Sequence, residues 1–410
     1  MECLLISHRR RQFVILFIIN SCINMGIGAF ESFFALHLIK NGISGIALGI
    51  ILALPAFPKI IAGHLFGKLG DKFDKGYLLL ASLSSLLIAG LIYLWCNVDI
   101  PVLSVLRIVQ GCSLALFRPV IFSLVGSCVD EKDRAEKFGI FDISFYVCVG
   151  VAPLFGGFLY DIYSFSVIVL CSVVFSCAGL LLTVVHIDNI GRQTNEIVPG
   201  ACSSGDSSTV SLYALCIFIV GRSCAISMTN TFLPVFFVVE KNISKMSTGL
   251  ILSLSTLVMA VFLKFSGRAA EKYSKYFMIM SGGVLFSLSC FFIVLIDGFI
   301  PYIFLFTLIG LSGSLSQPSV SALLMSSDKK NSLCESVGIF NAFMSSGFAT
   351  GPLIGAVIVK FFGLINVFLT AGLISLISLI GFTIISKKQI LTPNFKIGSN
   401  KRRKMVCKLE

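Results

Sequence analysis

The chain has 410 residues, of which 56% are apolar and 13% are charged, and its mean hydropathy is +0.96. A soluble protein of this composition would expose more apolar surface than water tolerates, which excludes an ordinary cytosolic enzyme, a disordered protein and a nucleic-acid binder. The net charge of +12 does not indicate a nucleic-acid partner, because residues 387–410 alone carry eight basic residues and one acid. A basic tail beside a membrane is typical of contact with anionic lipids.

Twelve long apolar segments follow one another along the chain. They comprise residues 13–39, 44–66, 77–96, 101–128, 138–160, 163–186, 210–239, 246–266, 276–297, 301–326, 336–360 and 364–386. Each has about the 20 residues that a helix needs to cross a bilayer. Because irregular backbone cannot face lipid, we expect twelve transmembrane helices and an all-α fold. The 14 cysteines and four histidines show no metal-ligand spacing, so we expect neither a metal nor a cofactor.

The distribution of Lys and Arg predicts the orientation in the membrane. With an even number of spans, both termini lie on the same side. The termini and loops of that side carry 23 basic residues, whereas the opposite loops carry only Lys40, Lys241, Lys245 and Lys360. The positive-inside rule then predicts cytoplasmic termini in a multi-pass protein of the cell (inner) membrane.

The longest predicted connection divides the chain into two parts. Residues 187–209 are polar and rich in Gly and Ser, which is typical of a flexible linker. We therefore expect one six-helix bundle over residues 1–186, a second over residues 210–386, and a basic cytoplasmic tail over residues 387–410. The expected functional unit is a monomer.

The two halves share residues at a shift of 199–200 positions. The sequence Gly139-Ile-Phe-Asp142 reappears as Gly338-Ile-Phe-Asn341, and Pro153 with Gly156 reappears as Pro352 with Gly355. A near-constant offset indicates a duplicated six-helix unit with pseudo-two-fold symmetry. Two such bundles can rock against each other around a central site.

Three motifs make the chain resemble the major facilitator superfamily up to about residue 386. They are Gly67-Lys-Leu-Gly-Asp71-Lys72-Phe-Asp74-Lys75 between spans 2 and 3, Arg107-Ile-Val-Gln110-Gly111 in span 4, and Ala152-Pro153-Leu-Phe-Gly156-Gly157 in span 5. The third resembles a stretch of the superfamily's drug–proton antiporters. Asp74 and Ala152 stand where the corresponding motifs have glycine. The resemblance implies two six-helix bundles and secondary transport by alternating access, not enzymatic catalysis.

The first motif predicts a cytoplasmic latch. A carboxylate at a helix end can sit against the N-terminus of a neighbouring helix, while basic neighbours pair with acids nearby. Such contacts can form in one rocked state and break in the other; the alternative is a solvated loop that only sets topology. The latch candidates are Gly67, Asp71, Lys72 and Lys75, with Glu271 and Lys272 in the second half.

Glycine and proline cluster in span 5 and in its counterpart. Small residues let helices approach closely, and proline frees a carbonyl and permits bending. A hinge and static close packing therefore both remain open. The residues concerned are Gly150, Pro153, Gly156 and Gly157, and Gly351, Pro352 and Gly355 in the second half.

Ionisable residues inside membrane spans are costly and mark functional sites. Glu31 lies about 12 Å from the outer end of span 1, and Arg107 lies about 9 Å from the outer end of span 4, at 1.5 Å per residue. Since the resemblance makes these spans neighbours at a central cavity, we expect Glu31 and Arg107 to interact. An acid beside an arginine can bind and release a proton as the polarity of the cavity changes.

Other charges inside the spans also predict contacts. Arg118 lies eleven residues after Arg107 and so on nearly the same helix face, from which it could bridge to Asp142 of span 5. In the second half both positions are neutral amides, Gln317 and Asn341, as expected if either charge is costly without the other. Two separate sites are the alternative. We expect Arg222 of span 7 to face an anionic group and Lys59 to snorkel towards the cytoplasm.

Taken together, these residues favour proton-coupled export of small amphipathic molecules. The alternative within transport is uptake or exchange of an anionic metabolite, clamped by Arg107, Arg118 and Arg222. A non-transporting sensor stays open. The Gly-x-Ser-Gly stretch at Ser312 resembles that of rhomboid proteases, but no histidine follows His186 to act as its base, which argues against an enzyme.

Overall fold

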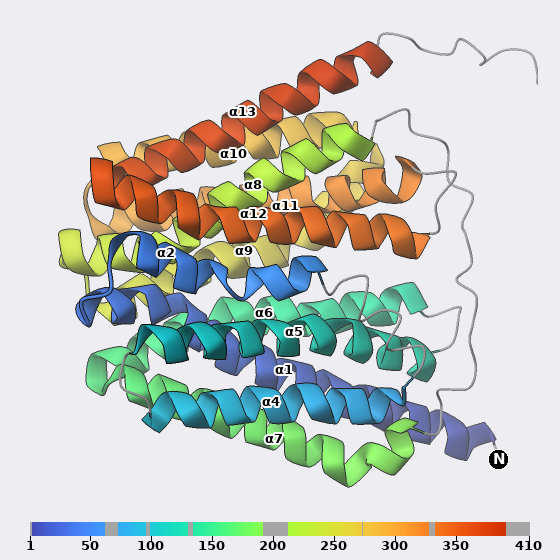
Figure 1. The fold of residues 1–410 in the computed structure, drawn as a ribbon. Coiled ribbons are helices and arrows are strands. Elements are labelled where there is room, and N and C mark those ends of the chain that lie inside the picture. Colours follow the sequence, from blue (N-terminus) through green and yellow to red (C-terminus); the bar gives the residue numbers. More distant parts are fainter. Residues whose placement is uncertain are drawn as a thin grey trace, which may run out of the picture.

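The computed structural model describes residues 2–61, 73–95, 99–129, 134–191, 212–272, 274–327 and 333–390. All regular elements in these ranges are helical (Figure 1). Eleven helices of the described chain are long and apolar enough to cross a membrane, and a shorter apolar helix, Gly45–Ile61, occupies the described part of the second predicted span. A helix therefore stands at each of the twelve predicted spans, and the all-α prediction is confirmed.

The helices follow one another through short turns. In chain order they are α1 (Glu2–Lys40), α2 (Gly45–Ala53), α4 (Lys75–Trp95), α5 (Ile100–Cys128), α6 (Arg134–Ile162), α7 (Phe165–Gly191), α8 (Leu212–Val235), η1 (Phe236–Glu240), α9 (Lys245–Lys272), α10 (Lys275–Leu295), α11 (Phe299–Ser327), α12 (Leu333–Phe362) and α13 (Ile365–Ile390). Several helices extend past the predicted spans. In particular, α7 continues to Gly191, into the segment predicted to be a linker.

Two helices change geometry where a proline interrupts their backbone hydrogen bonds. After α2 the chain makes a turn at Leu54 and Pro55 before the helix resumes, because proline has no N–H to donate. Pro234 near the end of α8 precedes the π-helical segment η1, in which the Lys241 amide donates to the Phe236 carbonyl. The tight turns that follow α1 and α12 place Gly42 and Gly363 at φ values of 84° and 87°, which favour glycine.

The helices form two bundles that are stacked in Figure 1, with α1 to α7 below and α8 to α13 above. Within the first bundle α1 packs on α6 and α7, and within the second α8 packs on α12 and α13. Three pairs join the bundles, namely α6 with α9, α2 with α12, and α1 with α8. Because α2 and α9 are equivalent in the repeat, as are α6 and α12, the first two pairs are related by the pseudo-two-fold symmetry.

Among the described residues, the bundles are joined at one end and pack separately at the other. We call the end bearing the α1–α2 and α12–α13 turns the distal end, and the opposite one the terminal end. One buried apolar cluster contains residues of both halves, such as Phe33 and Phe368. Two further clusters each stay within one half, around Leu83 in the first and Ile279 in the second. The structure therefore has a sealed distal end and two separately packed bundles at the terminal end.

Candidate functional site

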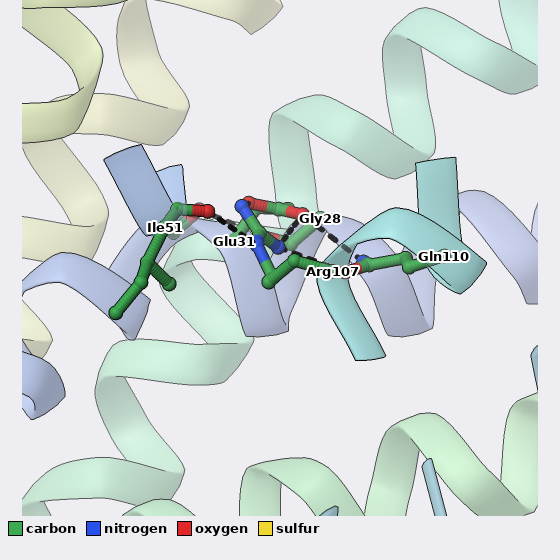
Figure 2. Close-up of polar contacts among 6 residues, drawn as sticks. Gly28, Glu31, Ile51, Arg107 and Gln110 are labelled. Atoms are coloured by element: carbon green, nitrogen blue, oxygen red, sulfur yellow. Dashed lines mark hydrogen bonds and ion pairs between the residues drawn. The ribbon is translucent and has the colours of Figure 1, made fainter. Parts of the chain in front are cut away.

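The predicted contact between Glu31 and Arg107 is present inside the first bundle (Figure 2). Nη1 of Arg107 donates to Oε1 of Glu31 at 2.6 Å, and Nη2 donates to Oε2 at 3.0 Å. Glu31 comes from α1 and Arg107 from α5, so the ion pair joins two helices. Two parallel hydrogen bonds between a guanidinium and a carboxylate fix both distance and orientation.

Gln110 and the backbone of Ile51 complete this cluster. The Gln110 amide donates to Oε1 of Glu31 at 3.0 Å, and its oxygen accepts from Nη1 of Arg107 at 2.8 Å. Nε of Arg107 donates to the carbonyl of Ile51 at 3.3 Å. Since residues three apart share a helix face, the spacing of Arg107 and Gln110 directs both side chains to one carboxylate. We call Glu31, Ile51, Arg107 and Gln110 the carboxylate cluster.

Gly111 allows the neighbouring segment to come close enough for this arrangement. A Cβ built on Gly111 would lie 2.6 Å from the carbonyl oxygen of Pro55, which no real side chain permits. The irregular turn at Pro55 therefore packs directly on the α5 backbone. This close approach brings the preceding Ile51 carbonyl within reach of Arg107 and explains why glycine follows Gln110.

The two charges of the ion pair differ in exposure. The Arg107 side chain is 2% exposed, whereas that of Glu31 is 36% exposed. The guanidinium lies over the ring of Phe34, with 4.7 Å from Cζ to the ring centroid, and more distantly over Phe30. Water can thus reach the carboxylate, while the arginine is sealed beneath aromatic rings.

The predicted bridge between Arg118 and Asp142 is not formed; no hydrogen bond or ion pair joins these two described residues. The Arg118 guanidinium stacks instead on Phe145 of α6, with Cζ 4.6 Å from the ring centroid. Asp142 remains within electrostatic range of Arg118. Phe145 follows Asp142 by three residues, so the aromatic ring competes with the carboxylate for the same guanidinium.

Lys59 lies in a different environment from the one predicted. It is partly buried and interacts electrostatically with Glu31, Arg107 and Arg118, so it belongs to the charged interior of the first bundle. Its charge therefore does not simply snorkel away from the membrane interior. The sequence signal for this placement is the pair of prolines at 55 and 58, which turn the helix just before Lys59.

Arg222 is buried in the second bundle. Its side chain is 7% exposed, and its guanidinium lies near the rings of Phe218 on α8 and Phe286 on α10, with 5.8 Å from Cζ to each centroid. The guanidinium therefore lies inside the second bundle, and the predicted contact with an anionic group stays a prediction. Nη1 of Arg222 has no hydrogen-bond partner in the described chain.

A contact that the sequence did not predict joins the bundles at the distal end. Oδ1 of Asp161, near the end of α6, accepts from the Lys245 amide at 3.1 Å, and Oδ2 accepts from the Met246 amide at 2.6 Å. The Lys245 ammonium lies 3.5 Å from Asp161 and donates to the Tyr160 carbonyl. Asp161 therefore caps the N-terminus of α9 across the interface. An acid at the end of one span and a helix start in the other half were the only signals for it.

This arrangement of helices matches a known family. A sequence profile described as Major Facilitator Superfamily matches residues 16–200 and 213–405, which is most of the chain. The chain belongs to the Major Facilitator Superfamily. It is therefore a multi-pass integral membrane transporter and not an enzyme.

Relatives within the superfamily are antiporters and efflux pumps. The proton-coupled antiporter flippase LtaA of Staphylococcus saprophyticus is 23% identical over 80% of this chain and 81% of its own. LtaA of Staphylococcus aureus is 23% identical over 89% of this chain and 91% of its own. The multi-drug resistance efflux pump PmrA of Streptococcus pneumoniae is 29% identical over 38% of this chain and 39% of its own.

Solved structures of superfamily members share the fold. A bacterial homologue of the human lysosomal transporter Spinster, inward-facing and unoccupied, superposes with a TM-score of 0.75 at 11% identity, covering 93% of this chain and 98% of that one. A variant of the nucleoside transporter NupG gives a TM-score of 0.72 at 12% identity, covering 91% and 99%. The two-bundle architecture expected from the superfamily resemblance is thus confirmed.

The glycine–proline stretch of span 5 forms the interface between α6 and α9. A Cβ on Gly150 would meet the Leu257 side chain, and one on Gly157 would overlap the Lys245 carbonyl oxygen. Gly156 faces α1 instead, with its Cβ 3.0 Å from the carbonyl oxygen of Ala29. The Leu154 amide, next to Pro153, donates to Oγ of Ser253 in α9 at 2.9 Å. These residues thus pack closely, as one of the two predictions stated; their role as a hinge stays a prediction.

The corresponding stretch of α12 packs on α8 and α2. A Cβ on Gly351 would lie 2.6 Å from the Cys224 carbonyl oxygen, and one on Gly355 would overlap the ring of Phe232. The Pro352 carbonyl oxygen faces Gly49 of α2, at 3.0 Å from a Cβ built there. The second interface between the halves therefore uses the same chemistry as the first.

The predicted latch lies mostly outside the described residues. Gly67, Asp71 and Lys72 fall in the range 62–72, which the structure does not describe, and only the backbone is described at Glu271 and Lys272, in the last turn of α9. Lys75 is the first residue of α4. Asp74, which replaces the motif's glycine, accepts from the Gly76 amide at 2.7 Å and so caps α4.

Proposed function

We propose that this transporter is a proton-coupled antiporter that exports small amphipathic molecules. The observation that supports this most is the carboxylate cluster, in which a water-accessible Glu31 is paired with a sealed Arg107. A carboxylate in this setting can take up a proton from water at one membrane face and release it at the other. The antiporters and efflux pumps among the relatives agree with this proposal.

The proton would act through the charge of Arg107. While Glu31 is ionised, the guanidinium is neutralised and hydrogen-bonded on Nε, Nη1 and Nη2. Protonation of Glu31 neutralises the only carboxylate of the described chain in direct contact with Arg107 and leaves a buried cation without a counter-charge. The cluster would then rearrange, and a substrate group or water would take the place of the carboxylate.

This rearrangement can reach the interface between the bundles. Glu31 is on α1, in which Ala29 touches Gly156 of α6, and Arg107 holds the Ile51 carbonyl of α2. Both α6 and α2 contact the second bundle directly. A change in the charge of Glu31 would thereby alter helices that join the halves, which couples proton binding to alternating access.

We also propose the membrane orientation that the basic residues predict, with both termini in the cytoplasm of a bacterial inner membrane. In this orientation the terminal end faces the cytoplasm and the sealed distal end faces outward, so the conformation described here is inward-facing. The division at residues 187–209, a monomeric state and contact of anionic lipids with the basic tail remain parts of the same proposal.

Transport by purified protein in proteoliposomes tests the proposal, with ethidium as a cationic amphipathic probe and an imposed pH gradient. We expect the wild type to accumulate ethidium only while the gradient lasts. Glu31→Gln should lose this accumulation but keep exchange of labelled for unlabelled probe without a gradient. Glu240→Gln, which changes an exposed glutamate at the end of η1, is the matched control. Gradient-driven accumulation by Glu31→Gln would refute the role of Glu31.

A second candidate function is transport of an anionic metabolite. It is favoured by the surplus of positive charge near the carboxylate cluster, where Lys59 and the exposed Arg118 have no carboxylate in direct contact within the described chain. A dansylated carboxylic acid serves as the anionic probe. If Arg118→Gln abolishes transport of this probe and spares ethidium, the anion is the better substrate class; if it affects both alike, the second candidate fails.

A further inference from the structure

Arg222 presents an unbalanced charge at the junction of three helices. Its side chain is 7% exposed, and its Nη1 atom is buried with no hydrogen-bond partner in the described chain. A guanidinium group keeps its charge at physiological pH, and an isolated charge of this kind is among the most costly groups to bury. Two phenylalanine rings near the guanidinium offer only their weakly negative faces. A counter-charge must come from elsewhere.

The second bundle cannot supply this counter-charge. Among its candidate membrane spans the only Asp or Glu is Glu240, the last residue of its span. Glu240 follows Arg222 by 18 residues, which is about 27 Å along the helix. Glu31 of the first bundle is already paired, and it lies about 14 Å from Arg222 in depth, judged from the distance of each residue from the distal end of its span.

A second unsatisfied polar group lies at the same junction. Oγ of Ser375 on α13 is buried and also has no hydrogen-bond partner in the described chain. The neighbouring Ile374 carbonyl oxygen and the Ser378 side chain face Gly221, the residue that precedes Arg222. The same part of α13 also packs on α10 on both sides of Phe286 in the sequence. Gly283 of α10 faces Leu379 of α13, and Ser287 of α10 faces Gly372 of α13. Arg222, Phe286 and Ser375 therefore converge between α8, α10 and α13.

We propose that this junction binds a small monovalent anion of the size of chloride. Nη1 of Arg222 supplies charge and a hydrogen bond, and the Ser375 hydroxyl supplies a second donor. A water molecule could satisfy the hydrogen bond but not the charge. A lipid headgroup or an organic substrate is too large for a position that is closed by three packed helices. The anion neutralises Arg222, which has no acid near its depth among the described spans of its bundle, and this role is independent of proton coupling at Glu31.

Thermal unfolding of the purified full-length protein in detergent tests the proposal. Chloride replaces gluconate at constant ionic strength, because gluconate is too large for the junction. We expect the Tm of the wild type to rise with the logarithm of the chloride concentration above the Kd, since a ligand stabilises the state that binds it. Arg222→Gln should show no chloride-dependent shift, and in gluconate it should be at least as stable as the wild type, because it carries no isolated charge.

Two serine variants provide a matched pair. Ser375→Ala should move the chloride midpoint several-fold higher, because one donor to the anion is lost. Ser386→Ala removes another buried hydroxyl that has no hydrogen-bond partner among the described residues, three turns further along α13, and should leave the midpoint unchanged. Equilibrium dialysis with radioactive chloride should give one bound ion per wild-type chain and none for Arg222→Gln. Since the wild-type measurements need no variant, they stand even if Arg222→Gln fails to fold.

A wild-type Tm that is equal in chloride and gluconate, together with no bound chloride, would overturn the proposal and leave water as the partner of Arg222. A chloride-dependent rise of equal size in Arg222→Gln would also overturn it, as a general salt effect. Neither result bears on ethidium transport by the wild type or by Glu31→Gln, so this proposal and the proposed function fail separately.

Discussion

Replacing Asp161 by alanine should open the distal end of the transporter. The carboxylate accepts hydrogen bonds from the Lys245 and Met246 amides, and these bonds exist only while α6 lies against the start of α9. Loss of such a helix cap costs about 0.5–2 kcal/mol, typically near 1, and a favourable charge at a helix N-terminus contributes about 0.3–1 kcal/mol more. We therefore expect Asp161→Ala to destabilise the closed distal end by about 1–2 kcal/mol, a five- to thirtyfold change in the conformational equilibrium.

Electron–electron resonance distances between spin labels measure this shift. Tyr163 in the first half and Ile300 in the second are exposed near the distal end and suit labelling in a background without native cysteines. Asp161→Ala should add or enlarge a long-distance population that the wild type shows weakly. Asp99→Ala is the control, since Asp99 directly precedes α5 near the same end and its side chain makes no capping hydrogen bond. If the distance distribution of Asp161→Ala equals that of the wild type, the cap does not hold the interface closed.

Three further predictions concern packing, the ion pair and a surface charge. Gly249→Ala places a methyl group on the Pro153 carbonyl oxygen and should open the same spin-label distance, at a cost of about 1–3 kcal/mol to the closed state. Glu31→Ala leaves Arg107 without its carboxylate and should lower the free energy of unfolding by about 1.5–3 kcal/mol. The double variant Glu31→Ala/Arg107→Leu should recover part of this loss, as measured by chemical denaturation in a double-mutant cycle. A hydrogen bond from Lys241 holds the pKa of Asp297 below its usual value. The stability that this bond adds is therefore present above about pH 4 and is lost as the pH falls below that value. The difference in Tm between the wild type and Asp297→Asn should accordingly disappear at low pH.

Hydropathy predicted the twelve helices well because a bilayer allows few alternatives. A segment of about 20 apolar residues must be helical in lipid, so length alone places each span within a few residues. The ends were less certain, since helices on the terminal side continue beyond the hydrocarbon region. The extension of α7 to Gly191 follows from this, because nothing in residues 187–191 interrupts a helix until the glycine itself.

The contact of Glu31 with Arg107 was predictable from depth, whereas side-chain direction elsewhere was not. Both residues lie near the outer third of neighbouring spans, and a carboxylate and a guanidinium at one depth have few other partners. Depth could not distinguish Asp142 from Phe145 as the partner of Arg118, because both lie within one turn of α6. The burial of Arg222 among aromatic rings was not predicted for a different reason. Its helix α8 is the most buried of the long helices in the described chain, so most of its sides meet other helices and its sequence does not show which side meets the cavity.

Duplication of a six-helix unit explains why the interfaces between the halves are symmetric. Divergence of the two copies explains why the carboxylate cluster lies in only one half. The pairs α2 with α12 and α6 with α9 are equivalent under the repeat, and in both a glycine lets backbone meet backbone. Two equivalent, closely packed joints suit a rocking motion, because neither half has to deform. The ionisable residues are not duplicated: the carboxylate cluster lies wholly in the first half. A proton bound there can shift the rocking equilibrium only through helices that also touch the second half, namely α1 and α2. Substitutions at the start of α2, far from Glu31, should therefore alter proton coupling without altering the carboxylate cluster itself.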